Sequence, residues 1–117
     1  EGVAFALRDG KDALESTGQP IRTAIAIGGG ARSPLWLSIL ANVLDMTLQR
    51  YPAAETGAAF GAARLARLAC TGEDPHAICR RPLGRARGFV PEPGLVAAYA
   101  ERRALWRQTA RFSRELR

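Results

Sequence analysis

The sequence predicts an α/β fold organised around one strand–helix–strand unit. Residues 21–27 alternate isoleucine or threonine with smaller or polar side chains, which is typical of a short strand. Three consecutive glycines follow at 28–30, and Ser-Pro at 33–34 then supplies a helix cap and a first helical residue. Residues 47–51 are expected to form a second short strand, which Pro52 ends. A strand, a helix and a strand of these lengths predict parallel pairing with a right-handed crossover.

The first helix is expected over residues 2–16. Val3, Leu7 and Leu14 fall on one helical face, and charged residues lie mostly opposite. Gly18 is a plausible C-cap, and the proline after Gln19 stops the helix. Phe5 and Ala6 lie beside this face, and the pattern predicts an amphipathic helix.

The strand at 21–27 has two different faces. Ile25 and Ile27 share one parity, whereas Ala24 and Ala26 share the other. Small residues on the second face predict a closely packed helix there. The sequence therefore predicts a strand that is covered on both faces, as in a parallel or mixed α/β sheet.

Three further segments complete the expected organisation. The helix after Ser33 carries a wide apolar stripe, and a helix at 57–69 is rich in glycine and alanine, which predicts close packing in a protein core. Residues 71–94 are expected to form an irregular surface segment, because they contain four prolines and four glycines. A final helix is expected over 95–115, with four large apolar residues near one face. They are Leu95, Tyr99, Trp106 and Phe112.

Composition bounds the class of protein. A chain of 117 residues with 47% hydrophobic content can form one modest domain. Its apolar runs fall well short of the length that spans a bilayer, so we expect no membrane association. Cys70, Cys79 and the single His76 make neither a zinc set nor a disulfide framework, which favours a reduced, cytoplasmic setting and no metal site in this chain. The chain starts at Glu1 without a methionine, and we expect it to be a fragment.

Positive charge is concentrated in the second half of the chain. The net charge is +6, and residues 61–117 carry twelve of the 17 basic residues but only five of the 11 acidic ones. One interpretation is a surface for nucleic acid or another anion. The other is a solvated, arginine-rich helix face. The second is favoured, because aromatic residues do not alternate with the arginines as base stacking would require.

The glycine triplet carries the strongest chemical signal. Between a strand and a helix, it places backbone N–H groups at a helix N-terminus, which favours an anion such as phosphate. A dinucleotide fingerprint fits poorly, because its last glycine position holds Ser33 and no acidic residue follows a second strand. A Walker A loop needs a Gly-Lys-Ser/Thr sequence, and no lysine is near. The third alternative is the nucleotide turn of the actin-like ATPase fold.

The sequence resembles the C-terminal domain of the FGGY carbohydrate kinases, and the xylulokinases most of all. Residues 27–48 read IGGGARSPLWLSILANVLDMTL, and residues 55–66 read ETGAAFGAARLA. The opening EGVAFALRDG is similar to the family's preceding helix, and the tail around Tyr99 and Trp106 is similar to its last helix. The resemblance implies a fragment of the second domain of the actin-like ATPase (ribonuclease H-like) fold, spanning residues 1–117.

The resemblance also implies a function. Such a kinase transfers the γ-phosphoryl group of ATP, with Mg²⁺, to a hydroxyl of a ketose or polyol. The glycine turn matches the family's adenosine-phosphate site, with Gly29 and Gly30 closest to the nucleotide. The implied nucleotide-binding residues in this chain are Gly28, Gly29, Gly30, Ala31 and Ser33.

The resemblance further implies what this chain does not supply. The family's general-base aspartate and its sugar-binding residues belong to sequence upstream, so no catalytic residue is expected here. The implied partners are a sugar substrate and the N-terminal part of the same kinase, and a homodimer is compatible with them. Glu55 and Gly57 match a second turn, where Gly57 and Gly61 are expected to hold their helix against the sheet. The alternatives are a non-catalytic nucleotide-binding module and a basic interaction protein that uses the final helix.

Overall fold

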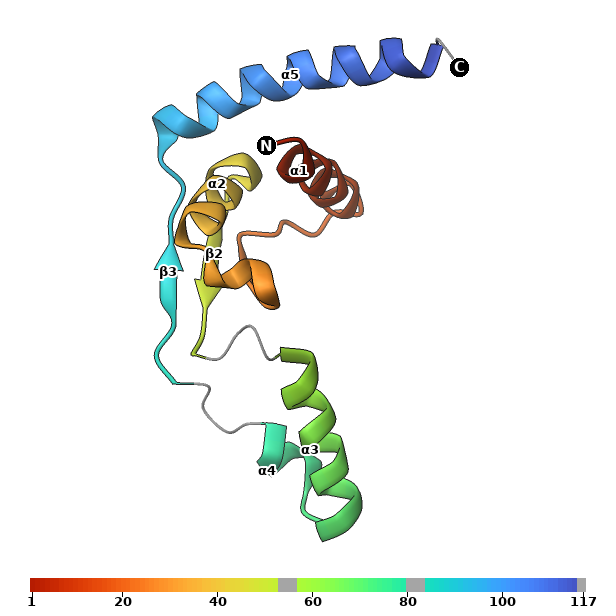
Figure 1. The fold of residues 1–117 in the computed structure, drawn as a ribbon, viewed down its shortest axis with the longest axis vertical. Helices are drawn as coiled ribbons and strands as arrows, with labels where there is room; N and C mark the ends of the chain where they lie inside the picture. Colours follow the sequence, from red (N-terminus) through yellow and green to blue (C-terminus); the bar gives the residue numbers. More distant parts are fainter. Residues whose placement is uncertain (53–56, 80–83, 116–117) are drawn as a thin grey trace.

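The computed structural model describes residues 1–52, 57–79 and 84–115 (Figure 1). The predicted strand–helix–strand unit is present, and each expected helix forms within a few residues of its expected bounds. In chain order the elements are α1 (Gly2–Glu15), β1 (Thr23–Ile25), the 3₁₀ turn η1 (Gly29–Arg32), α2 (Pro34–Leu44), β2 (Thr47–Arg50), α3 (Gly57–Thr71), α4 (Pro75–Cys79), β3 (Arg87–Phe89) and α5 (Pro93–Glu115).

The segment 71–94 is more ordered than its composition predicts. It contains α4, whose first turn is capped by the Asp74 carboxylate through the N–H groups of His76 and Ala77. It also contains β3, which pairs with β2. Prolines and glycines do bound these elements, but β3 forms through a long-range partner that a local pattern does not reveal.

The three strands form one small mixed sheet in the order β1–β2–β3. β1 and β2 are parallel, with Ala24 opposite Leu48. β2 and β3 are antiparallel, with Leu48 opposite Phe89 and Arg50 opposite Arg87. A further bond from the Ala26 N–H to the Gln49 carbonyl extends the parallel pair beyond β1.

Only one face of the sheet is covered. Leu48 and Phe89 are buried, and Ala24 and Ala26 pack against the same core, as their small size predicts. The prediction that the isoleucine face is also covered is wrong, because Ile25 and Ile27 remain 51% and 67% exposed. Alternation shows that a face is apolar, but another element must supply the cover. The described elements leave both side chains largely exposed, although the start of α3 at Gly57 lies close to Ile27.

Helix α2 is the centre of the core. Leu37 and Ala41 are 1% and 0% exposed, and the helix contacts α1, β2, β3 and α5. The buried Asn42 ties α2 to the segment before α5, because its Oδ1 accepts the Glu92 N–H at 2.7 Å, while its Nδ2 donates to the Ser38 carbonyl within α2 at 2.9 Å. The bond from Glu92 fixes the chain where it enters α5.

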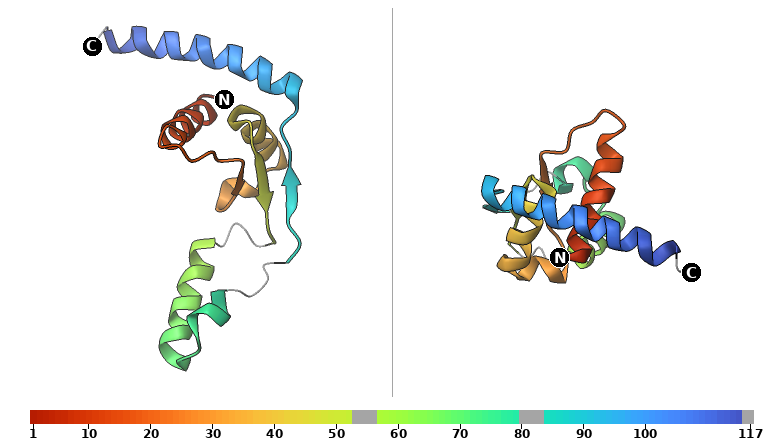
Figure 2. Two further views of the ribbon diagram at one scale, coloured as in Figure 1. Left: turned by 180° about the vertical axis from the view of Figure 1, so that it is seen from behind. Right: turned by 90° about the horizontal axis from the view of Figure 1, so that it is seen from above.

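Helix α5 lies across α1 and α2 at one end of the molecule (Figures 1 and 2). The rings of Tyr99 and Trp106 lie against the buried Phe5 of α1, with centroid distances of 6.5 and 5.8 Å. Of the predicted apolar stripe, these two residues pack against the core, whereas Leu95 and Phe112 stay exposed. The helix is longer than the core beneath it, so its end residues find no cover among the described elements.

Charged pairs also join α1 to α5. Arg103 donates to the carboxylates of Asp9 and Asp12, and Arg107 donates to Asp9 at 2.7 Å. Burial alone raises the pKa of the Asp12 carboxyl, but hydrogen bonds from Arg103 and Arg8 outweigh burial and hold that pKa below its ordinary value. The pKa of Asp9 is lowered in the same way by Arg103 and Arg107. A solvated arginine face therefore does not describe Arg103, whose side chain is only 14% exposed.

The apolar face of α1 and the whole of α3 are exposed in the described structure. The side chains of Val3, Leu7 and Leu14 are 67%, 48% and 61% exposed, because α1 turns Ala4 and Phe5 toward α2 and α5 instead. Helix α3 contains no buried residue, and with α4 it lies at the end of the molecule opposite α5 (Figures 1 and 2).

The structure separates the two glycines that were expected to hold α3 against the sheet. A Cβ at Gly57 would lie 3.4 Å from the Ile27 side chain, at the end of the expected strand, whereas one at Gly61 would meet nothing within 4 Å. Among the described residues, no helix is long and apolar enough to cross a membrane.

The ion pairs between α1 and α5 predict a particular pH dependence. The lowered pKa values of Asp9 and Asp12 stabilise the fold above about pH 4, and this stabilisation is lost as the pH falls through the lowered values. We expect Arg103→Gln to lower the unfolding free energy near pH 7 and to flatten its decline below about pH 4. Urea denaturation of the 117-residue chain at several pH values measures both effects.

The control is Arg22→Gln, which removes one positive charge from an exposed residue before β1. It should leave the acid-side slope near that of the wild type. Equal slopes for the two variants would show that Arg103 does not set the pKa values of these aspartates.

Candidate nucleotide-binding turn

The glycine triplet forms a compact turn between β1 and α2. Gly28 has φ +87° and ψ −179°, a conformation that is essentially restricted to glycine. The chain then enters η1, in which the Ala31 N–H donates to the Gly28 carbonyl at 3.0 Å and the Ser33 N–H donates to the Gly30 carbonyl at 3.2 Å. The turn is thus closed by its own hydrogen bonds and leads directly into α2.

The local structure explains the three glycines differently. Only Gly28 has a positive φ. A Cβ at Gly30 would lie 3.3 Å from the Trp36 indole, so glycine lets the turn approach that ring closely. A Cβ at Gly29 would meet nothing within 4 Å, and both Gly29 and Gly30 are exposed. No contact within the described chain therefore explains the glycine at 29, and its exposed backbone is open to another molecule.

Ala31 and Ser33 hold the turn in place. Ala31 is 2% exposed, so its side chain faces the protein interior. Ser33 is the N-cap of α2, and its Oγ accepts the Trp36 N–H at 3.2 Å. Pro34 occupies the first helical position, as predicted. Of the five residues expected to bind a nucleotide, Gly29 and Gly30 offer the most accessible backbone, while Ala31 and Ser33 support it.

The four aspartates of the chain all have structural roles. Asp9 and Asp12 pair with arginines of α5, and Asp74 caps α4. Asp45 ends α2 in the left-handed conformation, with φ 49°.

Glu55, expected to belong to a second turn, lies outside the described residues. Among those that are described, no three His, Cys, Asp or Glu side chains are grouped to hold a metal ion.

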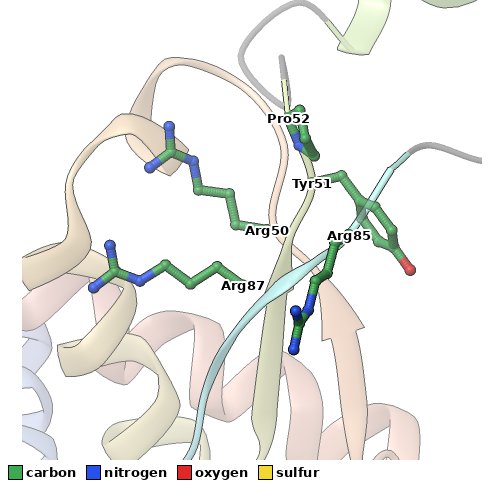
Figure 3. Close-up of a pocket in the computed structure, with 5 residues that line it drawn as sticks. All are labelled: Arg50, Tyr51, Pro52, Arg85 and Arg87. Atoms are coloured by element: carbon green, nitrogen blue, oxygen red, sulfur yellow. The ribbon is translucent and has the colours of Figure 1, made fainter.

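A hollow of about 200 Å³ lies where β2 ends and the chain enters β3 (Figure 3). Three arginines line it, together with Tyr51 and Pro52. Figure 3 shows the guanidinium groups of Arg50 and Arg87 extending in the same direction, whereas Arg85 and Tyr51 point elsewhere. The sequence analysis did not find this group, because the closeness of Arg50 and Arg87 depends on the pairing of β2 with β3.

Comparison with known proteins identifies the family. Residues 1–70 match the model of the C-terminal domain of the FGGY family of carbohydrate kinases. The chain belongs to the FGGY family. This confirms the resemblance read from residues 27–48 and 55–66. It also confirms the fold class, since the FGGY C-terminal domain has the actin-like ATPase fold.

Several FGGY relatives cover most of this chain. A xylulose kinase of Escherichia coli K12 is 35% identical over 108 residues, which are 92% of this chain and 22% of that protein. A xylulose kinase of Lactococcus lactis is 29% identical and covers 99% of the chain. The crystal structure of a "xyloylose kinase" from Brucella ovis has a TM-score of 0.79 at 40% identity, over 98% of this chain and 24% of that one. The chain thus spans about a quarter of the length of these proteins.

The turn geometry predicts different costs for alanine at neighbouring glycines. Gly28→Ala forces a side chain into a conformation that disfavours it, and we expect a loss of roughly 1–3 kcal/mol in the free energy of unfolding. Gly29→Ala places a methyl group in open space and should change that free energy by less than about 0.5 kcal/mol. Urea denaturation of the two variants measures the difference, and equal losses would contradict the assigned role of Gly28.

Proposed function

We propose that this chain is the nucleotide-binding C-terminal part of an ATP-dependent sugar kinase of the xylulose kinase type. The complete kinase, meaning this chain joined to the upstream sequence that the proposal requires, transfers the γ-phosphoryl group of ATP to a hydroxyl of a ketose or polyol. Membership of the FGGY family supports the reaction class. The names of the relatives support xylulose as the sugar.

The observation that carries the proposal is the exposed backbone of Gly29 and Gly30 at the start of α2. A side chain at position 29 would clash with nothing in the described chain. We therefore assign the need for glycine at this position to a bound molecule that contacts the backbone. The N-terminus of α2 adds a positive potential that favours phosphate. The Ser33 cap and the buried Ala31 keep this backbone in one position, so that little ordering is needed on binding.

The chemical step needs groups from outside this chain. A general base has to remove the proton of the attacking sugar hydroxyl, and the four aspartates here have other roles. Mg²⁺ bound to the ATP phosphates would offset their charge, and the proposal assigns its protein ligands to the rest of the kinase. The function we assign to the chain is therefore binding and orientation of the nucleotide.

The two alternative functions are less well supported. Arg102, Arg103 and Arg107 of α5 form ion pairs with carboxylates of α1 or with Glu1, so these cations are partly neutralised. A nucleic-acid surface on α5 would require free charge at these positions. A non-catalytic nucleotide-binding module would share the turn and differ only in lacking sugar phosphorylation, which the next experiment tests.

We expect the purified 117-residue chain to show no phosphorylation of xylulose, because it lacks a base and a sugar site. The complete kinase should show ATP-dependent turnover in the same coupled assay. Turnover by the isolated chain would contradict the proposal that the catalytic base and the sugar site lie outside this chain. An inactive complete kinase that still binds ATP would instead indicate a non-catalytic module.

We expect Gly29→Val in the complete kinase to raise the KM for ATP by at least about tenfold, because the side chain occupies the space assigned to the nucleotide. The KM for xylulose should change less than twofold. Gly61→Val is the matched control, because Gly61 also has open space around it but lies on α3. Unchanged ATP kinetics for Gly29→Val would remove Gly29 from the site.

A further inference from the structure

Two arginines lie directly opposite each other at the end of the sheet. Arg50 is the last residue of β2, and Arg87 is the first residue of β3 and its register partner. Directly opposed residues of an antiparallel pair have their Cβ atoms roughly 5 Å apart and point to the same face. Figure 3 shows both side chains extending in the same general direction from the two strands.

This arrangement is electrostatically unfavourable without a counter-charge. Like charges opposed across two strands destabilise the pairing. Among the described residues, no carboxylate forms an ion pair with Arg50 or Arg87. The guanidinium carbon of Arg87 lies over the Phe89 ring, 5.2 Å from its centroid. That contact holds Arg87 on the face it shares with Arg50. Two planar guanidinium groups on one side suit the bidentate binding of a phosphoryl group.

The same pair lies beside the glycine turn. β1 and β2 are parallel, so their carboxyl ends meet at one edge of the sheet. The bond from the Ala26 N–H to the Gln49 carbonyl places Arg50 next to the chain that enters Gly28. In Figure 3 that chain arches past the guanidinium of Arg50 on its way to α2.

We propose that Arg50 and Arg87 bind the phosphoryl groups of the nucleotide held at the glycine turn. This assignment rests on the proposed function and adds to it two side chains from the strands that end beside the turn. The backbone of Gly29 and Gly30 receives the nucleotide, and the two guanidinium groups neutralise its phosphates. Arg85 lines the same hollow but points away, and it takes no part.

The test compares a nucleotide with its nucleoside and with free phosphate. Isothermal titration calorimetry of the complete kinase measures the Kd values of ADP, adenosine and inorganic phosphate for the wild type, Arg50→Gln and Arg87→Gln. Each variant should raise the Kd of ADP by about tenfold, because one charge-assisted contact is lost. The Kd of adenosine should stay within twofold, which also shows that the variants are folded.

Arg22→Gln is the charge-matched control, since Arg22 lies at the opposite end of the parallel strand pair. It should leave the Kd of ADP unchanged. If both test variants bound ADP as tightly as the wild type, the arginine assignment would be overturned while the proposed function stood. Weaker binding of inorganic phosphate with unchanged ADP affinity would likewise overturn it, because the anion would then not belong to the nucleotide. A wild-type kinase that bound neither ADP nor adenosine would refute the proposed function itself.

Discussion

Burial of α2 is the constraint on which the rest of the described structure depends. Its apolar side chains meet the sheet on one side and α1 and α5 on the other, so a single helix organises two layers. Hydrogen bonds at its surface then position the neighbours. Arg8 of α1 donates to the Val43 carbonyl at 3.1 Å, and Asn42 accepts the N–H that precedes α5. These polar contacts are half-buried, so an alternative packing would leave them unpaired at a cost of about 1–3 kcal/mol each.

The glycine turn takes its shape from the same helix. Because α2 is held by its core face, its N-terminus is also held, and the turn that precedes it has little freedom. Ser33 caps the helix, and the buried side chain of Ala31 fixes the turn against the protein interior. Gly28 supplies the backbone conformation that joins the turn to β1. A backbone fixed in this way suits a site that recognises phosphate mainly by position and partial charge. Within our proposal, core packing and nucleotide binding are thus linked through α2.

Several apolar side chains of the described chain are exposed to solvent. Val3, Leu7 and Leu14 on α1, and Ile25 and Ile27 at β1, are about half exposed or more. On α3, Phe60 and Leu65 are likewise apolar and exposed. Large apolar surfaces of this kind usually contact other protein. The chain spans about a quarter of its relatives' length, and within our proposal the remainder of the kinase supplies these contacts.

Local signals in the sequence determined the elements of this protein. Helical periodicity, the Ser33-Pro34 start and the glycine triplet were sufficient to predict α1, α2 and the turn, because each depends on neighbours within a few residues. The parallel pairing of the two strands followed from the order strand, helix, strand, which restricts the possible connections. Tertiary structure alone decided which faces are buried, that β3 exists, that Arg103 binds Asp9 and Asp12, and that Arg50 faces Arg87. The reason is physical: a sequence pattern shows that a face is apolar or charged, but the partner that covers or neutralises it comes from a distant segment, through a register that only folding establishes.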